Sequence, residues 1–102
     1  MFEVQVLIPI VDNAGRTFTA FEHAEFEAFV IERFGGITRY SSEASGAWFD
    51  EGSLHRDRSY LYGIAVPSIT DGARVGDTVQ FAKVHYRQLA IFIRYLGIVE
   101  IL

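Results

Sequence analysis

The sequence predicts an α+β fold in which a four-stranded antiparallel sheet carries two helices on one face. Residues 2–10 and 58–66 alternate between apolar and other side chains, which is the period of a half-buried strand. Two longer segments have the spacing and the end signals of helices. With two further extended segments, the predicted order along the chain is βαββαβ.

The composition indicates one compact domain, residues 1–102. Of the 102 residues, 50% are hydrophobic and 15% aromatic, and the formal net charge is −4. This length suits a single domain, and the apolar content excludes a disordered chain. The chain contains no cysteine, which excludes disulfides, thiol catalysis and cysteine-ligated metal centres. We expect neither a metal site nor a cofactor.

The first strand and the first helix have clear local signals. Strand 2–10 places Phe2, Val4, Val6 and Ile8 on one face and Glu3, Gln5 and Leu7 on the other, and residues 12–16 are typical of a turn. A helix is predicted over residues 20–34. Thr19 and Glu22 form a capping box at its start, and Gly35 ends it.

The middle of the chain predicts a hairpin of uncertain form. Residues 36–40 and 47–50 favour extended structure, and the polar segment 41–46 separates them. That segment is either a loop between two short strands or a wide bulge within one strand. Residues 51–56 are predicted to turn, and the clearest strand follows over residues 58–66.

The second helix is predicted to follow a loop at residues 71–76. Asp77 would cap it and Gly97 would stop it, after which residues 98–102 form a short last strand. With right-handed crossovers, this element order gives the sheet order 4-1-3-2 of the ferredoxin-like fold. Because that fold hosts enzymes, RNA binders and regulators, it settles no function.

A surplus of apolar surface predicts a homodimer. The predicted second helix carries one stripe for the sheet and a second stripe. The second stripe consists of Phe81, His85, Gln88, Phe92 and Tyr95. Strand 58–66 also has apolar groups on both faces, with Tyr60 and Tyr62 on one and Leu61 on the other. A partner subunit would cover this surplus, and packing within the chain is the alternative.

A mostly apolar wall with a few polar groups is typical of a small-molecule pocket, and equally of a dimer interface. The candidate ligand-binding residues are Trp48, Tyr60, Tyr62, Gln88 and Tyr95. The ligand class that they suggest is a small apolar or aromatic molecule. For Trp48, packing in the core or an interface is the alternative interpretation.

The alternative function is a cofactor-independent oxygenase, isomerase or lyase of the dimeric α+β-barrel type. His85 and then His23 are the candidates to move protons. His23 and Glu27 share a helix face, although an ordinary ion pair explains that spacing equally well. Residues 53–58 are expected to form a solvated turn with an Asp–Arg pair, so His55 and Asp57 are not selected.

Membrane and nucleic-acid partners are not expected. No segment reaches the roughly 20 apolar residues of a spanning helix, and the first residues do not have the pattern of a secretory leader. We therefore expect a cytoplasmic protein. Residues 58–64 match part of an RNA recognition motif but lack its glycine, and the net charge of −4 disfavours binding to phosphates.

Several short pieces between residues 12 and 66 resemble a known family. They are DNAGR at 12–16, FGGIT at 34–38, GAW at 46–48, and RDRS at 56–59 leading into YLY at 60–62. The pattern is similar to that of small uncharacterised bacterial proteins of the ferredoxin-like type, a domain of unknown function. The resemblance implies the fold and assigns no catalytic residue.

Overall fold

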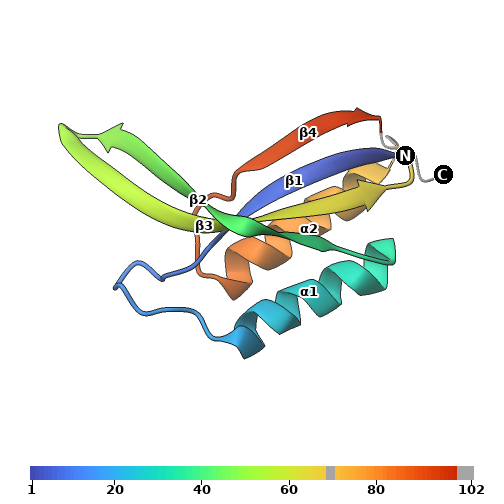
Figure 1. Ribbon diagram of the computed structural model, residues 1–102, viewed down its shortest axis with the longest axis horizontal. Coiled ribbons are helices and arrows are strands. Elements are labelled where there is room, and N and C mark those ends of the chain that lie inside the picture. Colours follow the sequence, from blue (N-terminus) through green and yellow to red (C-terminus); the bar gives the residue numbers. More distant parts are fainter. Residues whose placement is uncertain (69–70, 99–102) are drawn as a thin grey trace.

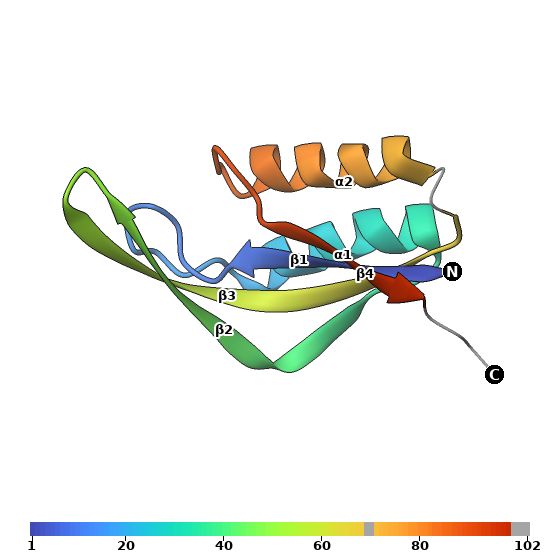
Figure 2. The same cartoon turned by 90° about the horizontal axis from the view of Figure 1, so that it is seen from above.

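The computed structural model describes residues 1–68 and 71–98. Its elements are β1 Phe2–Pro9, α1 Ala20–Phe34, β2 Thr38–Asp50, β3 Ser53–Val66, α2 Gly72–His85 and β4 Ile93–Ile98. The strands form one antiparallel sheet in the order β2-β3-β1-β4, and both helices lie on one side of it (Figures 1 and 2). The predicted α+β ferredoxin-like fold and its sheet order are confirmed.

The core lies between the sheet and the helices. Val4 pairs with Ile64 and Val6 pairs with Tyr62 across β1 and β3, and all four side chains are buried. Strand alternation places the Leu7–Leu61 pair on the other face, which the helices leave open. Tyr62 therefore belongs to the covered face of the sheet.

Helix α1 has the predicted bounds because its end signals are local. The Thr19 side chain accepts a hydrogen bond from the Glu22 backbone N–H, and the Glu22 carboxylate accepts one from the Thr19 N–H. Gly35 adopts a left-handed conformation with φ 85° and ends the helix. Its buried face carries His23, Phe26 and Val30.

The hairpin of β2 and β3 is longer than predicted. The bulge is the correct alternative for residues 41–46, because β2 is one strand with a register shift between Arg39 and Glu43. The turn predicted over residues 51–56 is present but shorter than predicted. Only Glu51 and Gly52 turn, both with positive φ, as in the tight hairpins whose twist matches that of the strands.

Because the strands stay paired up to the tight turn, they form a two-stranded extension over residues 45–58, which we call the arm. It projects well beyond the helices in both views (Figures 1 and 2).

Helix α2 lies earlier in the chain than predicted. The expected loop at residues 71–76 is wrong, because α2 begins at Gly72 and Asp77 lies inside it. It ends at His85, and Arg87 then adopts a positive φ of 53° that turns the chain back. The last strand is therefore Ile93–Ile98, not 98–102, and residues 99–102 lie outside the described residues.

This correction removes the second apolar stripe of the predicted helix. Only Phe81 and His85 of that stripe lie on α2. Gln88 and Phe92 lie in the connection to β4, and Tyr95 lies on β4 itself. The surplus of apolar surface on the second helix therefore does not exist, and a dimer needs another argument.

Candidate functional site

The structure divides the predicted site residues between two places. His23, His85, Tyr60 and Tyr62 lie near the α1 side of the sheet, around Tyr86; we call these five residues the histidine cluster. Trp48 and Gln88 instead line a cavity at the arm. Tyr95 is exposed on β4 opposite Val4 and is assigned to neither place.

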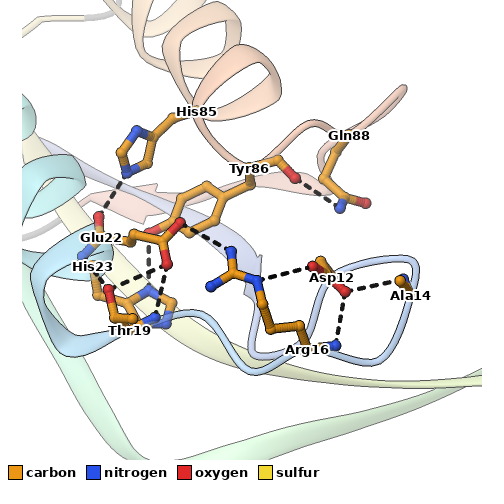
Figure 3. Close-up of polar contacts among 9 residues, drawn as sticks. All are labelled: Asp12, Ala14, Arg16, Thr19, Glu22, His23, His85, Tyr86 and Gln88. Carbon is orange, nitrogen blue, oxygen red and sulfur yellow. Dashed lines mark hydrogen bonds and ion pairs between the residues drawn. The ribbon is translucent and has the colours of Figure 1, made fainter.

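His23 is a buried histidine with one satisfied ring nitrogen. Its Nδ1 lies 2.8 Å from the phenolic oxygen of Tyr86 (Figure 3). The rings of Phe18 and Tyr60 pack edge-on against it, with centroids at 6.2 and 5.1 Å. Its Nε2 is buried and has no hydrogen-bond partner in the described part of the chain. An unsatisfied buried nitrogen is rare and calls for an explanation.

The surroundings of His23 favour a neutral ring. Burial lowers the pKa of His23, and the positive charge of Arg39 lowers it further, while Glu27 and Glu22 oppose both effects. Burial also raises the pKa of Tyr86, so the phenol keeps its proton. When Tyr86 donates that proton to Nδ1, the hydrogen of the neutral imidazole lies on Nε2.

Glu27 does not pair with His23. The Tyr62 hydroxyl donates to Glu27 Oε2 at 2.6 Å, and Arg39 Nη1 lies 3.9 Å from the same oxygen. Burial, followed by the hydrogen bond to Glu27, raises the pKa of Tyr62. The guanidinium of Arg39 also lies over the Tyr60 ring, 4.9 Å from its centroid. Glu27 thus links α1 to β2 and β3.

His85 connects the two helices. Its Nε2 donates to the backbone carbonyl of Glu22 at 2.7 Å (Figure 3). Its ring stacks on Phe81, with centroids 5.1 Å apart. Through this hydrogen bond, His85 links α2 to α1. Its catalytic role stays a prediction.

The second place is a cavity of about 390 Å³ where the arm meets the ends of β1 and the loop before β4. We call it the arm pocket. Its lining includes Leu7, Pro9, Trp48, His55, Asp57 and Phe92. The rings of Trp48 and His55 stack at a centroid distance of 4.5 Å with 22° between their planes. The two residues face one another across β2 and β3.

Asp57 is the acidic group of the pocket that lacks a partner. It makes no hydrogen bond or ion pair with any residue that the structure describes. It faces Gly46 across the arm, and a Cβ added at position 46 would collide with the Asp57 carboxylate. The glycine therefore provides the space in which that carboxylate lies.

Two other polar groups at the pocket are already engaged. Asp12 accepts hydrogen bonds from the backbone N–H groups of Ala14 and Arg16 and from the Arg16 side chain (Figure 3). These contacts, the backbone bond from Arg16 first, hold the pKa of Asp12 below its usual value. Gln88 Nε2 donates to the Tyr86 carbonyl, which fixes the amide near the pocket.

The turn expected at residues 53–58 is wrong, because these residues belong to β3, whereas their expected exposure to solvent is confirmed. Arg58 pairs with Glu43 on the facing strand, not with Asp57. His55 and Asp57 are thus pocket residues that the sequence analysis missed. Residues 53, 55 and 57 occupy alternate positions, which places their side chains on one face of a strand. This pattern identifies pocket residues only when the facing strand is known.

Neither a model of a protein family nor a curated protein matches this chain. The resemblance to small uncharacterised bacterial proteins stays a prediction. Among residues 1–68 and 71–98, no helix has the length and apolar character needed to span a membrane. The same ranges hold no group of three histidine, aspartate or glutamate residues arranged to hold a metal ion.

Proposed function

We propose that this protein is a homodimer that binds a small aromatic molecule in the arm pocket. The Trp48–His55 stack carries the proposal, because it provides an aromatic surface beside the apolar residues Leu7 and Phe92. A cavity with apolar walls and a few polar groups is the usual form of a small-molecule site. Its volume of about 390 Å³ is sufficient for a one- or two-ring compound.

The aromatic character of the ligand follows from the exposed indole. Trp48 remains 50% exposed although one of its neighbours stacks on it. A planar ligand that stacks on the indole removes apolar area from water and gains the preferred geometry of aromatic pairs. An aliphatic ligand of equal size gains only the first of these contributions.

The homodimer is supported by the other face of the arm. Phe49 and Leu54 pair across the strands there, and they are 71% and 51% exposed. An isolated two-stranded ribbon is only marginally stable in water, so it gains from being covered. In a two-fold dimer, each subunit covers the Phe49–Leu54 surface of the other, because such a contact uses the same surface on both subunits. Strand alternation leaves the arm pocket on the face turned away from this contact.

Light scattering during size-exclusion chromatography at tens of micromolar tests the dimer. We expect the wild-type protein to have twice the chain mass and the double variant Phe49→Ser, Leu54→Ser to have the mass of one chain. Phe21→Ser is the matched control, because Phe21 is equally exposed but lies on α1. A wild-type monomer, or a dimer that the double variant leaves intact, overturns this part of the proposal.

Protein-observed NMR with a panel of one-ring and two-ring aromatic fragments tests the pocket. We expect fragments to shift the amide signals of residues 46–57 and 88–92. Trp48→Ala should abolish these shifts, whereas Phe49→Ala should retain them. Fragments that leave both segments unchanged at millimolar concentration exclude the arm pocket as a site.

The bacterial cytoplasmic location stays a prediction from the cysteine-free composition.

The second candidate is the cofactor-independent enzyme of the dimeric α+β-barrel type. The unpaired Nε2 of His23 favours it, because in the tautomer whose Nδ1–H donates to the Tyr86 hydroxyl oxygen, the lone pair of Nε2 is free to accept a proton. Tyr86 would hold the ring in place through Nδ1. The arm pocket does not include His23, so the two candidates rest on different residues.

The opening of 5-nitrobenzisoxazole tests His23 as a base. In this reaction the base removes the ring C–H proton, the N–O bond breaks, and a coloured cyanonitrophenolate forms. The enzyme candidate predicts a rate above buffer at pH 7.5 that His23→Gln returns to background. Equal rates for the wild type and the variant, or no rate above buffer, remove the support for this candidate.

A further inference from the structure

The arm pocket contains one carboxylate without a partner. Asp57 carries a carboxylate that no described residue pairs, and its position over Gly46 fixes it on the same face as Trp48 and His55. Asp57 is exposed, so its carboxylate can reach a cation through a charge-assisted hydrogen bond without being buried. The net charge of −4 for the whole chain acts in the same direction.

The positive side chains near the pocket do not supply that cation. Arg56 and Arg58 border the cavity, but alternation along β3 places their side chains on the opposite face of the arm. The Arg58 guanidinium makes three hydrogen bonds to Glu43 there, at 2.9 to 3.0 Å. Arg16 is engaged by Asp12 and Glu22.

We infer that the ligand of the arm pocket is an aromatic cation, a ring joined through a short linker to a protonated amine. The ammonium group binds Asp57 while the ring stacks on Trp48. This inference rests on the proposed small-molecule function and names its ligand class. A cation close to the indole also gains from the ring quadrupole.

The spacing on the arm suits such a ligand. His55 and Asp57 are two positions apart on one face of β3, which separates their side chains by about 7 Å. Trp48 lies beside His55, and Gly46 lies beside Asp57. A single aromatic ring with a two-carbon linker spans a comparable distance. Ring and ammonium can therefore contact Trp48 and Asp57 at the same time.

Three compounds of nearly equal size and different charge test the inference. They are 2-phenylethylamine, which is cationic, 2-phenylethanol, which is neutral, and 3-phenylpropionate, which is anionic. Dissociation constants are measured by NMR titration at pH 7.0 and low salt. We expect the amine to bind at least about tenfold more tightly than the other two, a factor that one charge-assisted hydrogen bond readily provides.

The variant Asp57→Asn should remove the preference for the amine and leave the affinity for 2-phenylethanol unchanged. Asp50→Asn is the matched control, because Asp50 lies on the same arm next to the turn and is not part of the pocket lining. Gly46→Ala should reduce the preference as well, because the new methyl group displaces the Asp57 carboxylate.

The outcomes separate this inference from the proposed function. If the neutral compound binds as tightly as the amine, and Asp57→Asn changes neither, the aromatic-cation class is wrong and the pocket stands. If the anion binds best, the class is wrong as well. If none of the three shifts a pocket signal, both the inference and the small-molecule function are overturned.

Discussion

Trp48 and His55 stack face to face across the arm, at a centroid distance of 4.5 Å. They come from facing strands and meet because β2 and β3 keep their register up to the tight turn at Glu51 and Gly52. The arm pocket thus depends on a two-residue turn that lies outside it. Substitutions in that turn should therefore alter the stacking of Trp48 on His55.

The first prediction concerns the turn. Gly52 has a φ of 79°, and an L-residue in the left-handed region costs about 1 kcal/mol. We expect Gly52→Val to loosen the arm, shift the amide signals of residues 46–57 and weaken the binding of 2-phenylethylamine. Gly36→Ala is the control, since a methyl group there meets nothing within 4 Å and no positive φ is involved. Unchanged arm signals in Gly52→Val would contradict this dependence.

The second prediction concerns the wall of the pocket. Trp48→Leu removes the stacking surface, so 2-phenylethylamine should bind at least about tenfold more weakly. The midpoint of thermal unfolding should change little, because Trp48 is half exposed. Phe49→Leu changes the adjacent residue on the other face and should leave binding unchanged. Equal losses in the two variants would mean that the arm, not the pocket, mediates binding.

The third prediction concerns pH. The folded protein holds the pKa of His23 below its ordinary value of 6.5, so the unfolded chain binds a proton more readily. The stability that the neutral, buried ring provides is therefore present above pH 6.5 and is lost as the pH falls below that value. One such group changes the free energy of unfolding by at most about 1.4 kcal/mol per pH unit.

Urea unfolding at pH 7.5, 6.0 and 5.0 measures this effect. His23→Gln should flatten the dependence in that range, because glutamine does not titrate. The lowered pKa values of Asp12 and Glu22 act only at more acidic pH and leave this window unaffected. If the variant keeps the wild-type slope between pH 7.5 and 5.0, His23 is not the group responsible.

The fourth prediction compares two tyrosine hydroxyls. Tyr62 is fully buried and donates to Glu27 at 2.6 Å, whereas Tyr40 is exposed and donates to Glu3 at 2.9 Å. Removing a buried hydrogen bond to a charged group costs about 2 kcal/mol, and an exposed one costs less than about 1 kcal/mol. Urea unfolding of Tyr62→Phe and Tyr40→Phe should show this order, and the reverse order would contradict the role given to Glu27.

The sequence was most informative where structure is encoded locally. Thr19, Glu22 and Gly35 mark both ends of α1 without reference to the rest of the chain. The strands β1 and β3 follow from their apolar alternation. The order of all six elements, together with the rule for crossover connections, is enough to predict the sheet order.

The second helix shows where local signals fail. The apolar residues after His85 have helical spacing, but they belong to the loop before β4 and to β4, which pairs with β1. This pairing satisfies backbone groups of β1 that would otherwise lie at a sheet edge. The left-handed residue Arg87 that redirects the chain carries no glycine signal. Long-range pairing, not local preference, therefore decides this region.

For the same reason, the sequence predicts only some residues of the candidate site. The sequence indicates Trp48 because it is the single tryptophan, whereas it predicts that His55 and Asp57 lie in a solvated turn. Their importance depends on which residues face them across the arm, namely Trp48 and Gly46. That register is set by the turn at residues 51–52, whose type the sequence analysis did not identify.

The indole N–H signal of Trp48 provides the most direct test of the arm pocket. The chain has one tryptophan, so a ¹H–¹⁵N spectrum contains a single indole signal. On titration with 2-phenylethylamine, we predict that this signal shifts and saturates together with the amides of Asp57 and Phe92. An indole signal that stays in place, or saturable shifts confined to α1 and α2, would contradict a ligand site at the arm.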